Sequence, residues 1–182
     1  IAFTDVDCIL EKNWVQAIVD AYQQDPGFHI LSGNTLSFDR GWLGIYHEIN
    51  GTLNGRKFIG LDRLLYGATA NLAITATVAK NVRFNEAFRE PACEDVEFCF
   101  RANEKGFGIR QVHEMMVEHN YGYSSHAFNN LKGFMKLFKK YGKADIMNYH
   151  RLNWKPVNIF KVSTPRKKYR KPFNYCHYIL EL

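Results

Sequence analysis

Short apolar runs alternate with amphipathic segments in the first part of the chain. Residues 1–4 form a mostly apolar run, which predicts a buried strand. Apolar side chains then recur at helical spacing over residues 10–22, and a turn signal follows at residues 25–27. A second apolar run, residues 28–34, predicts another strand. Strand, helix and strand in this order indicate an α/β sheet.

Three less regular segments continue the pattern. Residues 42–49 favour a helix. Two apolar runs within residues 64–74 flank small residues, and Gly67 would allow a backbone to approach a ligand closely. Residues 108–117 predict a further strand, and His119 follows its end. A histidine at a strand end is equally compatible with a structural role and with metal ligation.

A helix beginning at Glu94 is well indicated. Acidic residues in its first turn suit the positive end of the helix dipole, and Glu97 and Arg101 have the spacing of an ion pair. Gly106 is a natural C-terminal stop. Asp95 is therefore expected at the N-terminus of this helix, beside the sheet edge. The buried stripe is predicted to contain Val96, Cys99 and Phe100.

Two carboxylates, Asp5 and Asp7, follow the first apolar run. Alternate residues of an extended chain point the same way, so these side chains are expected to lie close together. Carboxylates at short range repel each other unless a cation or a proton lies between them, which indicates a divalent-metal site. A solvated strand end would give the same pattern.

The order and spacing of these motifs resemble the GT-A glycosyltransferases of the family 2 type. In that family a strand-end Asp-x-Asp is followed by a Glu-Asp helix that carries an Arg and ends in Gly. The similarity extends from Phe3 to about Gly142. It implies a GT-A-like, Rossmann-like mixed sheet flanked by helices. Residues 1–150 would form part of the catalytic domain, and residues 151–182 a basic C-terminal extension.

The resemblance implies a metal-dependent inverting transferase that moves one sugar from a nucleotide-diphosphate-sugar donor to a carbohydrate or lipid-linked acceptor. The first candidate donor is a UDP-sugar. Asp95 would be the general base, with Glu94 beside it. Asp5 and Asp7 would contact the donor and hold Mn²⁺ or Mg²⁺ with His119. The Gln-x-x-Arg-Trp of processive synthases is missing, which favours single-sugar transfer. Further donor-binding positions would be Gly67 and Asn71.

The chain also departs from the family pattern. Relatives carry a nucleotide-binding half before Asp-x-Asp, whereas only four residues precede Asp5 here. We therefore expect this half to be missing from residues 1–182 and the sheet to have an open edge beside residues 1–4. These residues alone are expected neither to bind nucleotide-sugar tightly nor to turn it over. Residues 90–93 stand where many relatives have glycines.

Charge is distributed unevenly along the chain. Residues 1–130 contain 11 Lys/Arg and 16 Asp/Glu, whereas residues 131–182 contain 13 and 2. The basic part begins with an amphipathic helix, for which packing on its own sheet and peripheral contact with an anionic membrane are both compatible interpretations. Nucleic acid is not an expected partner. The predicted apolar face contains Leu131, Phe134, Met135, Leu137, Phe138 and Tyr141.

The cysteines are four and scattered, with no Cys-x-x-Cys pair. This pattern indicates reduced thiols and argues against cysteine-ligated zinc. Reduced thiols are typical of a cytoplasmic protein, which could still contact the inner face of a membrane. At 46% hydrophobic and 15% aromatic residues, the composition supports one packed domain.

Two other functions fit the same residues. An apolar strand followed by Asp-x-Asp also resembles the haloacid-dehalogenase phosphatases, in which Asp5 would be the nucleophile and Asp7 the acid/base. A catalytically inactive GT-A-like domain that serves as a binding or assembly surface is the third alternative. Metal-dependent donor hydrolysis would separate the transferase from the inactive domain, and phosphatase activity on a generic ester would favour the dehalogenase interpretation.

Overall fold

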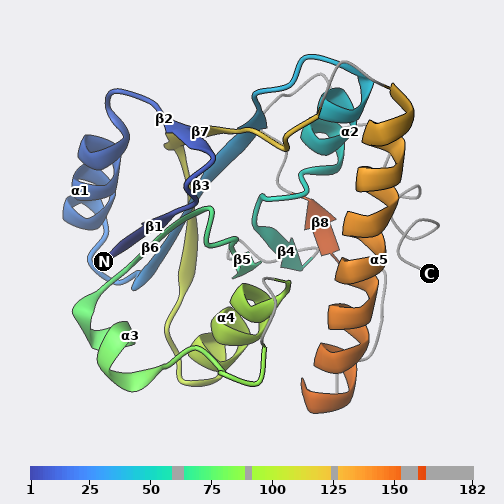
Figure 1. The fold of residues 1–182 in the computed structure, drawn as a ribbon. Helices are drawn as coiled ribbons and strands as arrows, with labels where there is room; N and C mark the ends of the chain where they lie inside the picture. The colour runs from blue at the N-terminus through green and yellow to red at the C-terminus, as the bar shows by residue number, and fades with distance from the viewer. Residues whose placement is uncertain (59–63, 89–91, 124–126, 153–159, 163–182) are drawn as a thin grey trace.

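The computed structural model describes residues 1–58, 64–88, 92–123, 127–152 and 160–162 of the chain. Its centre is a five-stranded mixed sheet in the order β1-β6-β3-β7-β2 (Figure 1). β3 and β7 are parallel, and the other neighbours are antiparallel. The predicted α/β class is confirmed. The strands of this sheet are β1 (Ala2–Thr4), β2 (Cys8–Leu10), β3 (Ile30–Ser37), β6 (Asn71–Ile74) and β7 (Ile109–His119).

Helices cover both faces of this sheet because strand side chains alternate between the faces. Ile30 and Leu31 are neighbours on β3, yet they belong to different hydrophobic clusters. Leu31 packs with α1 (Trp14–Gln24), whereas Ile30 packs with α3 (Ala76–Asn81) and α4 (Glu94–Glu104). The central layer is thereby buried between two helical layers.

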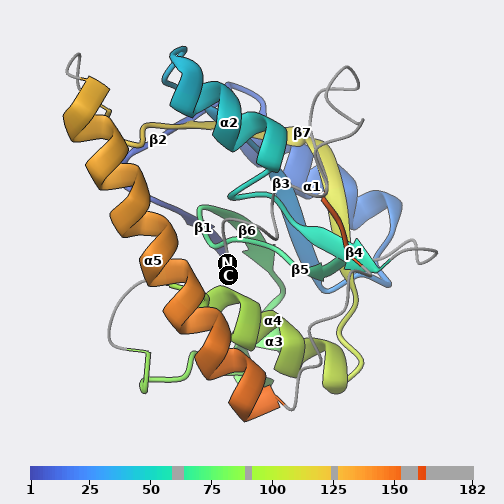
Figure 2. The ribbon, with the colours of Figure 1, turned by 90° about the vertical axis from the view of Figure 1, so that its right-hand side faces the viewer.

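Two further helices pack together at one side of the molecule. These are α2 (Trp42–Asn50) and the long α5 (Ala127–Leu152), which Figure 2 shows running from α2 towards α4. Phe134 and Phe138 of α5 are buried against Leu43 of α2. Leu131 and Met135 are 42% and 56% exposed, so only part of the predicted apolar face is covered.

A small second sheet has the strand order β5-β4-β8. Its strands are β5 (Leu64–Tyr66), β4 (Arg56–Phe58) and β8 (Phe160–Val162). The basic residues beyond Val162 lie outside the described part of the chain. None of the helices in the described ranges has the length and apolar character needed to cross a bilayer.

Several sequence predictions need correction. The helix predicted from Leu10 begins at Trp14, because Leu10 pairs with Val117 in β2. Phe98, rather than Phe100, is fully buried on α4. The helix α3 was missed altogether.

The first strand also differs from its prediction. Ile1 is 68% exposed, because β1 is an edge strand and lacks a neighbour on one side among the described residues. The open edge expected beside residues 1–4 is therefore present. Phe3 alone of this strand turns inward, where it packs against the cluster that contains α4.

Candidate functional site

The first ten residues change partners at the two carboxylates. Thr4 is the last residue that pairs with β6, and Cys8 is the first that pairs with β7. Asp5 and Asp7 lie in the turn between them. The Cys8 amide donates to the Asp5 carbonyl at 3.1 Å, and the Asn120 amide donates to the Asp7 carbonyl at 2.9 Å. These backbone bonds fix the turn at the sheet end.

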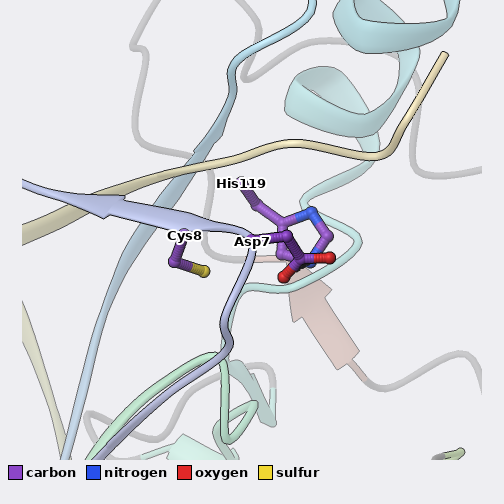
Figure 3. Close-up of side chains that lie close together, drawn as sticks. All are labelled: Asp7, Cys8 and His119. Carbon is purple, nitrogen blue, oxygen red and sulfur yellow. Dashed lines mark ion pairs between the residues drawn. The ribbon is translucent and has the colours of Figure 1, made fainter.

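The structure brings His119 to this turn (Figure 3). Its Nε2 lies 3.3 Å from Asp7 Oδ1 and 3.8 Å from Asp5 Oδ2. Both carboxylates are about half exposed, whereas His119 is buried. Burial lowers the pKa of His119 despite the opposing effect of Asp7, Asp5 and Asp39, so the ring is neutral at neutral pH.

These three residues were predicted to act together, and they do lie together. Carboxylate oxygens and a neutral imidazole are suitable ligands for Mn²⁺ and similar divalent ions. The donor set therefore fits the metal that the sequence implies. Cys8 also belongs to the group, since ligand atoms of Asp7, Cys8 and His119 all lie within 4.8 Å of one another. Cysteine spacing did not indicate this thiol.

An aromatic stack supports His119 from the side of α2. The Tyr121 ring lies 4.5 Å from the His119 ring and stacks on His47 at 3.8 Å. His47 is held in turn by Thr52 Oγ1 at 2.9 Å from its Nδ1 and by the Tyr123 hydroxyl at its Nε2. Burial lowers the pKa of His47 to about 3, so this stack carries no charge at neutral pH.

Asp95 lies at the start of α4, as predicted, and is mostly buried. Its Oδ2 accepts a hydrogen bond from the Thr69 amide at 3.3 Å, and its Oδ1 accepts one from the Val96 amide at 2.7 Å. Burial, with a smaller contribution from the Glu94 carboxylate, raises the pKa of Asp95 to about 7. Glu94 Oε2 is buried without a hydrogen-bond partner in the described ranges.

A cavity of about 390 Å³ is lined by Asp5 of the carboxylate pair, by Thr69 and by Glu94 at the start of α4. Asp7, His119 and Asp95 are not among its lining residues. Its volume is at the lower end for small-molecule sites, which are typically about 300–1,000 Å³. The remaining lining residues are Phe3, Thr4, Phe84, Asn85, Glu86 and Phe88.

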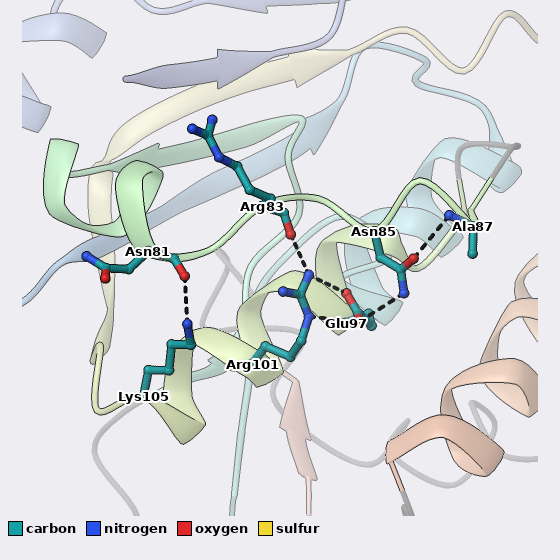
Figure 4. Close-up of polar contacts among 7 residues, drawn as sticks. All are labelled: Asn81, Arg83, Asn85, Ala87, Glu97, Arg101 and Lys105. Atoms are coloured by element: carbon teal, nitrogen blue, oxygen red, sulfur yellow. Dashed lines mark hydrogen bonds and ion pairs between the residues drawn. The ribbon is translucent and has the colours of Figure 1, made fainter.

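Polar contacts from α4 hold the loop that forms one wall of this cavity (Figure 4). Arg101 makes the predicted ion pair with Glu97 at 2.8 Å and donates to the Arg83 carbonyl. Glu97, which is buried, also accepts a hydrogen bond from Asn85 at 3.3 Å. Lys105 donates to the Asn81 carbonyl at 2.7 Å. The segment between α3 and α4 is thereby anchored, mainly through its backbone, to the helix that carries Asp95.

Asn71 and Gly67 do not lie in the site. The Asn71 amide donates to the carbonyls of Asn34 at 3.0 Å and Met115 at 2.9 Å, and its oxygen accepts from Trp14 Nε1 at 2.9 Å. At Gly67 the close approach is to Ser32, whose Oγ would lie 2.5 Å from an added Cβ. Both residues therefore serve the packing of the sheet rather than the cavity.

The loop before α4 has one unusual backbone conformation. Cys93, which precedes Glu94, has a φ of 58°. Among the described residues, no other non-glycine residue has a positive φ. Such a conformation is left-handed and favours glycine. Residues 90 and 91 of the segment that departs from the family pattern lie outside the described part of the chain.

The sequence did not indicate two other residues of the site. Thr69 contributes through its backbone amide, which any residue other than proline would supply, so its side chain carries no signal. Phe84 stands in a short apolar segment that could equally belong to the core, and it does stack on buried Phe98 at 4.4 Å. Only the three-dimensional arrangement shows that both line the cavity.

The raised pKa of Asp95 predicts an unusual pH dependence of stability. Between about pH 4 and 7 the folded chain keeps a proton that the unfolded chain has lost, so the free energy of unfolding falls as pH rises. The loss is roughly 4 kcal/mol at most. Urea unfolding across this range should show the decline in the wild type and a flatter profile in Asp95→Asn. Equal profiles would show that Asp95 titrates normally.

The sequence matches no protein-family model and no curated protein.

Proposed function

We propose that this chain carries the metal, sugar and acceptor side of an inverting GT-A-type glycosyltransferase site. The supporting observation is that one cavity is lined both by Asp5 of the carboxylate–imidazole cluster and by Glu94, which precedes Asp95 at the N-terminus of α4. These two features arise from segments about 90 residues apart, and each suits a different step of sugar transfer. The reaction would move one sugar from a nucleotide-diphosphate-sugar to an acceptor hydroxyl.

Asp95 would act as the general base. A carboxylate with a pKa near 7 is basic enough to accept a proton and is still largely ionised at slightly alkaline pH. The amides of Thr69 and Val96 orient its two oxygens. As the acceptor oxygen attacks the anomeric carbon, its proton passes to Asp95, and the bond from that carbon to the diphosphate breaks. Glu94 lines the cavity beside this base.

Asp5, Asp7 and His119 would hold a divalent cation. When bound, such an ion supplies positive charge that offsets the charge of the leaving diphosphate. The fold holds the neutral imidazole of His119 close to the carboxylates of Asp5 and Asp7, where β7 ends beside the turn between β1 and β2. The stack of Tyr121 on His47 keeps the His119 ring in place.

The cavity itself suits a sugar or a polyol. Its described lining contains the carboxylates of Asp5, Glu86 and Glu94 and no Lys or Arg. Carboxylates accept hydrogen bonds from hydroxyl groups, and aromatic faces pack against the apolar face of a sugar ring. An anionic phosphoryl group, including the diphosphate of the donor, would find no cationic side chain there and would rely on a bound cation to offset its charge.

A panel of nucleotide-sugars, each incubated with the full-length protein and Mn²⁺, tests the proposal. Release of the nucleoside diphosphate should depend on the metal and increase with the correct acceptor. Hydrolysis of a generic phosphate ester would instead support the dehalogenase-type alternative. If neither activity is found with any donor, the inactive binding domain becomes the better explanation.

Metal titrations give a separate prediction. Asp7→Ala should weaken Mn²⁺ and donor binding together, by about tenfold or more, because it removes a charged ligand. His119→Ala should have a smaller effect. Glu114→Ala, an exposed carboxylate on the same strand as His119, is the matched control and should change nothing. Unchanged metal affinity in both ligand variants would place the metal site elsewhere.

A further inference from the structure

Cys8 and His119 are fixed opposite each other by the sheet. They are direct partners in the antiparallel pairing of β2 with β7. Directly opposite residues of an antiparallel pair project from the same face, with Cβ atoms about 4.5–5.5 Å apart. The thiol and the imidazole therefore meet because of strand register, which does not depend on the conformation of a mobile loop.

Asp7 completes the group from the adjoining turn (Figure 3). Its carbonyl is bonded to the Asn120 amide, and its carboxylate lies 3.3 Å from His119 Nε2. One ligand atom from each of the three residues falls within 4.8 Å of the others. Around a tetrahedral ion with bonds of about 2.0–2.3 Å, ligand atoms lie roughly 3.3–3.8 Å apart. Small side-chain rotations would close the difference.

The nitrogen of His119 that faces the group is Nε2, 3.3 Å from Asp7 Oδ1, and the residue is 9% exposed. Its Nδ1 is buried without a hydrogen-bond partner among the residues that the structure describes. The Cys8 thiol donates a long hydrogen bond of 3.7 Å to the Ala70 carbonyl, which metal binding would replace. Asp5 Oδ2 lies 3.8 Å from His119 Nε2 and is a candidate fourth ligand.

We propose that Asp7, Cys8 and His119 form a three-ligand site for a thiophilic divalent cation such as Zn²⁺, in preference to Mg²⁺. Binding breaks the Cys8 S–H bond, releases the proton to solvent and forms a thiolate–metal bond. Thiolate and imidazole favour zinc, whereas Mg²⁺ requires oxygen ligands. The inference concerns the cluster used in the proposed function, but it stands on this geometry and does not require sugar transfer.

Cobalt titration of the full chain tests the site directly, because Co²⁺ replaces Zn²⁺ and reports its ligands by absorption. The wild type should develop a near-ultraviolet thiolate-to-cobalt band that added Zn²⁺ removes. Cys8→Ser should lose this band and bind Zn²⁺ more than about tenfold more weakly. Cys93→Ser, a half-buried cysteine outside the cluster, is the control and should keep the band.

The result that overturns the inference is equally clear. A wild type without the band, or a band that persists in Cys8→Ser, would show that Cys8 is only a small core residue packed near α1. Circular dichroism of Cys8→Ser establishes that the variant is folded. Mn²⁺-dependent sugar transfer without the cobalt band would refute this inference alone, and the band without transfer would refute the proposed function alone.

Discussion

Replacing Asp95 by Asn is expected to lower the rate of sugar transfer by about 10²–10⁴-fold. The amide can still accept a hydrogen bond from the Thr69 or Val96 amide, so the shape of the site is kept. It cannot accept the acceptor's proton. Because that proton moves only in the transition state, donor affinity should remain nearly unchanged.

Steady-state kinetics of the full-length protein would measure this effect. The wild-type rate should rise with pH as Asp95 ionises near pH 7, and the residual rate of the variant should lack this step. Glu104→Gln, at the exposed far end of α4, is the matched control and should behave like the wild type. Transfer within tenfold of the wild type would remove Asp95 from the role of base.

Asn71→Ala is expected to destabilise the fold by roughly 3–5 kcal/mol. The substitution leaves the carbonyls of Asn34 and Met115 and the Trp14 indole N–H without their buried partner. These groups belong to α1, β3 and β7, and Asn71 is 1% exposed. Water cannot replace the lost bonds without opening the structure.

Denaturant unfolding provides the measurement, with Asn81→Ala as control. Asn81 is exposed at the end of α3, so its replacement should change the free energy of unfolding by less than about 0.5 kcal/mol. If Asn71→Ala weakened donor binding while leaving stability intact, the donor-binding role implied by the sequence resemblance would be restored.

The sequence predicted the parts of the site whose signals are local. Asp5 and Asp7 after an apolar run, and Glu94 and Asp95 opening a helix, depend on neighbours within a few positions. The open edge beside residues 1–4 was expected, but the same run was predicted to be buried, and only Phe3 of β1 turns inward. The short helix α3 was missed.

Residue roles that depend on strand pairing could not be predicted from the sequence. Asn71 resembled a ligand-binding residue, but its amide is used by Trp14 and two backbone carbonyls from distant segments. The scattered cysteine spacing argued against a cysteine-ligated metal and gave no sign that the β2–β7 register places Cys8 opposite His119. Contacts between residues so far apart in sequence are set by the complete topology, which a local sequence pattern does not predict.

The parallel pairing of β3 with β7 has a consequence for folding. The connection between these strands includes α2, α3 and α4, so the chain must close a long loop before β7 can join the sheet. β2 pairs with β7, and Asp7 and His119 lie 112 positions apart. Such non-local pairing slows folding. In a refolding experiment, metal-binding capacity should therefore emerge with the slowest phase, after most helical signal has returned.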